Sequence, residues 1–205
     1  MKILAQNVFS AAAVASATGP GAGPVLSRRT VLRHLGALGV GGLAGAPAIA
    51  AAAAFEVRPW PANQPLPRLS AQDLDGRSWD LERLHGRAVL LNFWATWCEP
   101  CLAEMPSLQD VASIYGEQKL QVLAINYKES AAKALQFART SGLTLPILRD
   151  HDGAIARAWG VRVFPSTVLI DAAGRPVQRV IGEVDWSGAK ARGWLEGSMS
   201  GAART

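Results

Sequence analysis

Two cysteines three residues apart are the residues of this 205-residue chain best suited to chemistry. Cys98 and Cys101 come shortly after Ala88–Trp94, an apolar run with the length of a central strand, and a helical pattern begins at Pro100. At the start of a helix, residues i and i+3 have Cα atoms about 5–6 Å apart, which a disulfide can bridge. We therefore expect a C-x-x-C pair that interconverts between a dithiol and a disulfide.

The two cysteines are not equivalent in this arrangement. Cys98 lies at the helix N-terminus, where unpaired N–H groups and the helix dipole favour its thiolate, so it is the expected nucleophile. Cys101 lies one turn further in, is expected to be shielded, and would resolve a mixed disulfide. Pro100 fits the first turn, where its missing N–H costs nothing. A bridge across so short a loop stabilises a fold by only about 2 kcal/mol, so a purely structural disulfide is disfavoured.

Other uses of two cysteines fit the sequence less well. A structural zinc site needs about four ligands, and outside the first 54 residues only His85 and His151 could join the cysteines, at no recognisable spacing. Haem attachment needs a histidine where Leu102 stands. We therefore expect no metal and no cofactor apart from the redox-active disulfide. A copper-carrying thiol protein and an adaptor that holds partners through its cysteines stay open as alternatives; Met105 is the only methionine near the pair.

The first 54 residues differ in charge from the rest of the chain. They contain Lys2, Arg28, Arg29 and Arg33 and no acidic residue, whereas residues 55–205 hold 17 basic and 16 acidic side chains, a net charge of +1. The high isoelectric point therefore belongs mostly to the N-terminal segment. A nucleic-acid-binding domain would need basic charge concentrated on the folded part, so nucleic-acid binding is not expected.

This segment, residues 1–54, has the pattern of an export signal. Residues 27–33, Ser-Arg-Arg-Thr-Val-Leu-Arg, resemble the twin-arginine signature, and the weakly hydrophobic uncharged run 35–54 follows. Small residues around 50–54 suit cleavage, so we expect a periplasmic mature protein. An uncleaved N-terminal membrane anchor is the alternative, because the run has about the ~20 residues needed to span a bilayer.

Residues 55–205 are long enough for one well-buried domain. Their pattern starts with the extended, proline-rich stretch 55–67 and the hairpin 69–81, which turns at Asp75-Gly76. The order of the remaining elements predicts a mixed central sheet with helices on both faces, an α/β fold. The expected elements are a helical turn at 81–85, strands at 88–94, 120–127 and 145–148, helices at 100–115, 130–140, 153–159 and 187–195, and a hairpin formed by 166–171 and 176–184.

Three motifs together resemble one family. They are Asn92-Phe93-Trp94-Ala95-Thr96-Trp97-Cys98-x-x-Cys101, then Glu104-Met105-Pro106, then Phe164-Pro165-Ser166-Thr167. The chain is similar to the thioredoxin superfamily, in its exported TlpA/ResA branch, over roughly residues 65–197. The resemblance implies a thioredoxin fold with an N-terminal β-hairpin extension, and a cis Pro165 beside the cysteines. Peroxidases of this fold need a separate cysteine, which this chain lacks.

The resemblance also implies which residues contact substrate. The peptide edge before Pro165 can pair with a client backbone, and the residues expected to contact the client are Trp97, Glu99, Pro100 and Phe164. Glu104 stands where ResA-like proteins keep a glutamate near the active site, so we take it as a catalytic candidate. A solvated position on the helix surface is an equal alternative for Glu104. Asn92 replaces the buried aspartate of general thioredoxins, which removes a carboxylate from beneath the cysteines.

The implied function is a periplasmic thiol–disulfide oxidoreductase. Glu99 and Glu104 place negative charge near the thiolates, which favours a reductase over an oxidase; the oxidase is the alternative on the same fold. The implied clients are exported proteins with disulfides or thiols, of the cytochrome c maturation or copper-oxidase assembly type. A membrane electron donor would restore the dithiol, and we expect the protein to be a monomer.

Overall fold

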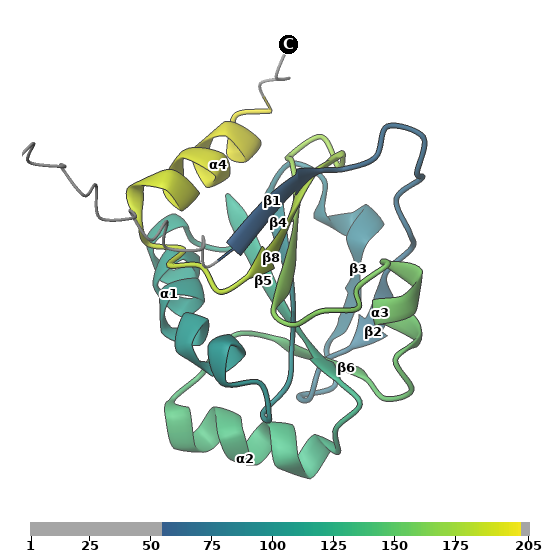
Figure 1. The fold of residues 1–205 in the computed structure, drawn as a ribbon, viewed down its shortest axis with the longest axis vertical. Helices are drawn as coiled ribbons and strands as arrows, with labels where there is room; N and C mark the ends of the chain where they lie inside the picture. The colour runs from purple at the N-terminus through teal and green to yellow at the C-terminus, as the bar shows by residue number, and fades with distance from the viewer. Residues whose placement is uncertain (1–54, 202–205) are drawn as a thin grey trace, which may run out of the picture. The chain divides into compact units, whose positions relative to one another are not determined.

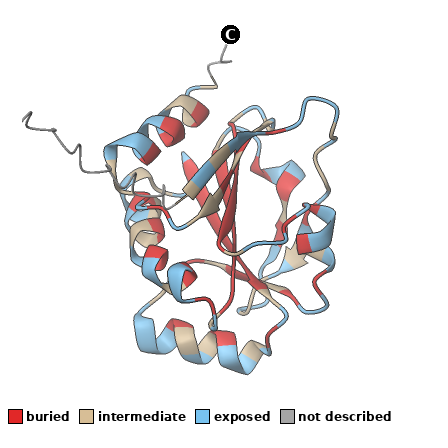
Figure 2. Cartoon of the chain, viewed as in Figure 1, coloured by how far each residue is buried: buried red, intermediate tan, exposed pale blue. Residues whose placement is uncertain are grey.

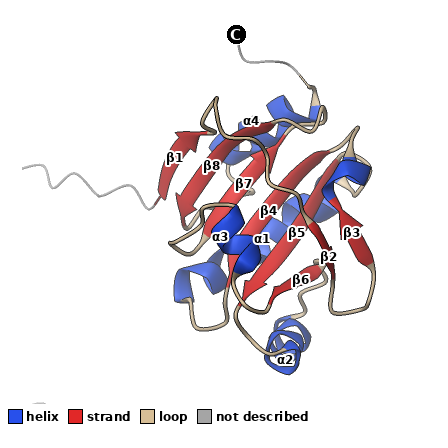
Figure 3. Cartoon of the chain, turned by 90° about the vertical axis from the view of Figure 1, so that its right-hand side faces the viewer, coloured by secondary structure: helices blue, strands red, loops and turns tan. Residues whose placement is uncertain are grey.

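The computed structural model describes residues 55–201, which fold around a six-stranded mixed sheet (Figure 1). The strand order is β1-β8-β7-β4-β5-β6 (Figure 3). The central strand β4 pairs in parallel with β5, which pairs in parallel with β6, whereas β7, β8 and β1 add antiparallel neighbours. The strands are β1 (Phe55–Pro59), β4 (Ala88–Trp94), β5 (Leu120–Tyr127), β6 (Ile147–Asp150), β7 (Ser166–Ile170) and β8 (Pro176–Gly182).

Helices cover both faces of this sheet, as the element order predicts. Helices α1 (Glu99–Tyr115), α2 (Ala131–Ser141) and α4 (Ala189–Met199) contribute to one apolar cluster, which takes Leu90 from β4. On the other face, α3 (Ala154–Ala158), the short 3₁₀ helix η1 (Leu81–Leu84) and the hairpin of β2 (Ser70–Gln72) and β3 (Ser78–Asp80) pack over Leu91. Because side chains alternate along a strand, β4 serves both clusters and is buried throughout (Figure 2).

The structure corrects the ends of several elements. The extended lead-in 55–67 begins as a true edge strand, β1, whose Val57 pairs with Val180 of β8. The third parallel strand runs over Ile147–Asp150 and not over 145–148. The final helix continues to Met199 rather than ending at 195. Strand β8 ends at Gly182 rather than at 184, because the N–H of Val184 donates to a side chain of α1 instead of to the sheet.

The proposed export segment, residues 1–54, lies outside the described residues. Between residues 55 and 201, no helix combines the length and the apolar character that crossing a membrane requires.

Candidate active site

Cys98 and Cys101 form a disulfide at the start of α1. Their Cα atoms are 5.2 Å apart, within the range expected from the spacing. Cys98 is the N-cap residue of the helix, and no side chain caps the free N–H groups of the first turn. Cys98 is 5% exposed, whereas Cys101 is fully buried. Cys98 is therefore the more accessible of the two cysteines, as the predicted order of attack and resolution requires.

The segment before Pro165 lies against the loop that carries Cys98. The Phe164–Pro165 peptide bond is cis, as the resemblance implies. The Phe164 ring meets Trp97 edge to face, with ring centroids 5.8 Å apart, and lies 4.7 Å from the Tyr127 ring. Trp97 remains 59% exposed. An apolar surface therefore lies next to the disulfide, as expected for a site that receives a polypeptide.

Glu99 and Pro100, the residues between the cysteines, are both exposed at the start of α1. Pro100 lies in the first turn, where no helical hydrogen bond needs its N–H. The Glu99 side chain is therefore on the surface, one residue after Cys98.

Glu104 is buried, so the alternative of a solvated helix position is wrong. The residue is 2% exposed. Its Oε1 accepts a hydrogen bond from Asn92 Nδ2 at 2.6 Å, and its Oε2 accepts from the Val184 N–H at 3.1 Å and from Trp186 Nε1 at 3.4 Å. Burial raises the pKa of Glu104 to about 7, and the negative Glu183 nearby adds to this rise, although the three donors oppose it. One turn beyond Cys101, the chain thus holds a carboxyl group that changes protonation near neutral pH.

Asn92 connects this carboxyl group to the cis-proline segment. Its Nδ2 also donates to Thr167 Oγ1 at 3.0 Å, and Thr167 follows Pro165 by two residues. The side-chain oxygen of Asn92 has no partner within residues 55–201. The replacement of aspartate by Asn92 therefore does not leave the site without a buried carboxyl group, because Glu104 supplies one from the helix.

Glu129 is a site residue that sequence reasoning missed. Its carboxylate accepts from the Thr96 N–H at 2.7 Å, from Thr96 Oγ1 at 2.6 Å and from Asn126 Nδ2 at 2.9 Å, and it pairs with Lys133 at 2.7 Å. Burial alone would raise the pKa of Glu129, but Lys133 and the other donors outweigh it, so the pKa lies below its usual value. This anion fixes the backbone two residues before Cys98. In the sequence, only the position of Glu129 just after the buried strand 120–127 could have indicated that it belongs to the site.

The segment after β8 was also missed. The N–H of Gly182 donates to the Pro165 carbonyl at 2.9 Å, and two residues later the N–H of Val184 donates to the Glu104 carboxyl group. Trp186, expected only to pack, is fully buried and donates to the same carboxyl group. The Cys98 loop, the cis-proline segment and residues 182–184 are therefore linked by contacts, although they are distant in the sequence.

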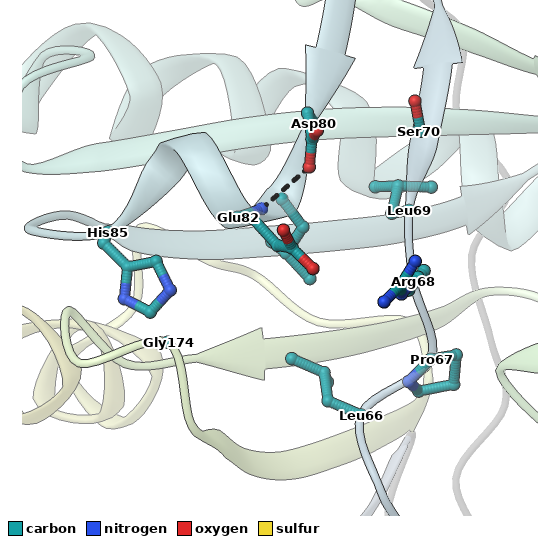
Figure 4. A pocket seen from close by; sticks show the side chains of 10 residues that line it. Leu66, Pro67, Arg68, Leu69, Ser70, Asp80, Glu82, His85 and Gly174 are labelled. Atoms are coloured by element: carbon teal, nitrogen blue, oxygen red, sulfur yellow. Dashed lines mark hydrogen bonds between the residues drawn. The ribbon is translucent and has the colours of Figure 1, made fainter.

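A separate hollow of about 450 Å³ lies between residues 66–70, η1 and Gly174 (Figure 4). His85, on its wall, precedes β4, whereas Cys98 follows β4. Gly174 follows β7, whereas Pro165 precedes it. Because β4 and β7 are antiparallel neighbours, the hollow lies at the opposite end of the strands from the disulfide and takes no part in this site.

Comparison with known proteins places the chain in a family. The AhpC/TSA family matches residues 62–178, which include the cysteine pair and the cis-proline. The chain belongs to the AhpC/TSA family. Among curated AhpC/TSA-like relatives, it is similar to the thiol-disulfide oxidoreductase ResA of Geobacillus thermodenitrificans, with 40% identity over 56% of this chain and 66% of that protein. ResA of Bacillus thuringiensis is 35% identical over 57% of this chain and 68% of that protein. The matched stretch thus spans about two thirds of each relative.

Solved structures support the same fold for this AhpC/TSA-family chain. A thiol:disulfide interchange protein of the thioredoxin family from Chlorobium tepidum matches with a TM-score of 0.59 and 24% identity, over 66% of this chain and 96% of that chain. A secreted Mycobacterium tuberculosis disulfide oxidoreductase matches with a TM-score of 0.52 and 26% identity, over 65% and 96%. The thioredoxin fold, the family and the Cys98–Cys101 pair together make the protein a thiol–disulfide oxidoreductase.

Proposed function

We propose that this protein reduces disulfides in exported client proteins, in the periplasm. The observation that carries the proposal is the unequal burial of the pair: Cys98, next to the exposed Trp97, keeps 5% of its surface accessible, and Cys101 keeps none. A reversible redox pair needs one accessible nucleophile and one shielded resolving sulfur. The pair itself is the redox group, and the proposal needs no further cofactor.

The reaction consists of two exchange steps. The Cys98 thiolate attacks one sulfur of a client disulfide, so a Cys98–client S–S bond forms while the client S–S bond breaks, and the departing client sulfur takes up a proton. The Cys101 thiolate then attacks Cys98 Sγ, which forms the protein disulfide and releases the second client thiol. We propose that Glu104, which is buried one turn after Cys101 on α1 and has a pKa of about 7, takes up the proton that Cys101 gives up. Two electrons pass to the client, and a membrane dithiol donor restores the reduced pair.

Capture of the client tests this function. In a Cys101→Ala variant the first step proceeds, but nothing releases the mixed disulfide. We expect exported proteins to accumulate in covalent complexes with Cys98 that dissociate on addition of dithiothreitol, and mass spectrometry of these complexes would identify them. Apocytochrome c and copper-site assembly proteins are the proposed clients. A Cys98→Ala/Cys101→Ala variant is the matched control, and equal capture by both variants would contradict the proposal.

The direction of electron flow follows from the charges near the pair. Negative charge at Glu99, and at Glu104 once it loses its proton near pH 7, disfavours the thiolate and so the reduced, ionised form, whereas a strong oxidant needs that form stabilised. We expect a glutathione-equilibrium titration to give a potential well below the roughly −120 mV of a strong periplasmic oxidant and nearer the roughly −270 mV of thioredoxin. A measured potential near roughly −120 mV would instead indicate an oxidase on the same fold.

Export is part of the proposal and depends on residues 1–54. The secreted mycobacterial structural relative supports it, as does the Arg28-Arg29 signature. We expect simultaneous replacement of Arg28 and Arg29 by lysine to leave the protein in the cytoplasm, measured by cell fractionation. Mature protein in the periplasm of a strain without the twin-arginine translocase would exclude this route. A full-length, membrane-bound form would favour the anchor. We propose that the exported protein works as a monomer.

A further inference from the structure

The surface around the disulfide carries opposite charges on its two sides, and their placement indicates what kind of client segment fits. This inference rests on the proposed function and extends it to the client. On one side, the hydrogen bonds of Gly182 and Val184 hold the intervening Glu183 between the cis-Pro165 carbonyl and Glu104 of α1. Glu183 is exposed, and its negative charge also raises the pKa of the buried Glu104.

The opposite side is basic. Arg162 is exposed and precedes Phe164 by two residues. Lys128 is exposed, with its Nζ 5.2 Å from the centre of the Tyr127 ring, which in turn packs on Phe164. Tyr127, before Lys128, and Val161, before Arg162, pack in the apolar cluster on the α3 face of the sheet, whereas Val184, after Glu183, belongs to the cluster on the α1 and α4 face. Phe164 packs against both clusters. The chain positions that carry the positive and the negative charges therefore adjoin opposite faces of the sheet, on either side of the cis-proline segment that contacts the Cys98 loop.

The charges of Glu183, Arg162 and Lys128 have no ion-pair partner within residues 55–201. Unpaired rim charges of opposite sign are the usual means by which an interface selects and orients a partner.

The centre of this surface is apolar and offers backbone groups. Trp97 and Val163 are 59% and 56% exposed, unusually high for large apolar side chains in this domain. Within residues 55–201, no hydrogen bond uses the backbone N–H or carbonyl of Phe164. An extended peptide can therefore pair with Phe164, place an apolar side chain against Trp97 and bring its sulfur to Cys98.

We propose that the client of this protein is an extended polypeptide segment whose reacting cysteine is flanked by a basic residue on one side, which contacts Glu183, and by an acidic residue on the other, which contacts Arg162 and Lys128. The apolar centre contributes affinity, and the two charged sides set the direction in which the segment lies.

Three synthetic peptides test this proposal with the reduced Cys101→Ala protein. Each has one cysteine joined to thionitrobenzoate, whose release on capture by Cys98 is followed by absorbance. The first peptide has lysine before and glutamate after the cysteine, the second has the reverse order, and the third has glutamine at both places. Each rate is divided by the rate of the same variant with uncharged hydroxyethyl disulfide, which removes effects on the reactivity of Cys98 itself.

We expect one of the two charged orders to react about threefold to tenfold faster than the neutral peptide, and this advantage to vanish in 1 M salt. The double reversal Glu183→Lys/Arg162→Glu should transfer the preference to the other order. The matched control Glu82→Lys/Arg83→Glu reverses exposed charges beside η1, at the far end of the strands, and should change nothing. Equal rates for all three peptides, or a preference that the double reversal does not move, would overturn the proposal. If hydroxyethyl disulfide also fails to react, the proposed function itself fails.

Discussion

Cys98→Ser is expected to abolish disulfide reduction, down to the rate of the uncatalysed reaction. Cys98 is the less buried residue of the pair, and the free N–H groups of the first turn of α1 favour its thiolate. In the reduced wild-type protein, iodoacetamide near neutral pH should therefore modify Cys98 much faster than Cys101. Peptide mapping after timed quenching measures both rates, and insulin reduction measures the activity.

Cys101→Ser is the matched control for the nucleophile. This variant should still form mixed disulfides through Cys98 but should fail to release them. Because the bridge closes so short a loop, its loss should lower the free energy of unfolding by only about 2 kcal/mol in both variants, so both should remain folded. Circular dichroism checks this point. Capture of partners by Cys101 in the Cys98→Ser variant would reverse the two roles.

Glu104→Gln is expected to remove a pH dependence of stability. The pKa of Glu104 is raised from 4.5 to about 7, chiefly by burial, so folding favours the protonated form. This contribution to stability is fully present below pH 4.5, the pKa of Glu104 in the unfolded chain. It declines as the pH rises and is lost above about pH 7, the pKa of Glu104 in the folded protein. The free energy of unfolding of the wild type should therefore fall, relative to that of the variant, by on the order of 3 kcal/mol across this window.

The comparison uses the disulfide form of both proteins, in which the cysteines do not titrate, and urea unfolding at each pH. Glutamine can keep the local hydrogen bonds. Its side-chain oxygen accepts from the Val184 N–H. Its side-chain NH₂ can donate to the unpartnered Oδ1 of Asn92 after the Asn92 amide flips. Glu117→Gln, at an exposed position, is the control and should leave the pH profile unchanged. Parallel profiles for wild type and Glu104→Gln would mean that Glu104 does not titrate in this range.

The local sequence determined the redox pair and most of the elements around it. The Cys98–Cys101 spacing, the preceding apolar strand and Pro100 are contiguous, and each acts through backbone geometry over a few residues. For this reason the disulfide at a helix start and the buried strand β4 could be predicted with correct limits. The cis Pro165 was accessible too, but only through resemblance of its motif to a family, since the short-range pattern does not distinguish cis from trans.

Contacts between distant segments decided the rest. Glu104 looked equally suited to a solvated helix face, because its burial depends on Val184 and Trp186, about 80 residues further along the chain. Glu129 reaches back 33 residues to Thr96, and β1 becomes a strand by pairing with β8. Periodicity reports which face of an element is apolar, but it does not report which polar group the partner segment supplies. The disulfide could therefore be predicted from sequence. The buried carboxyl group of Glu104 and the placement of the exposed charges of Glu183, Arg162 and Lys128 required the tertiary structure.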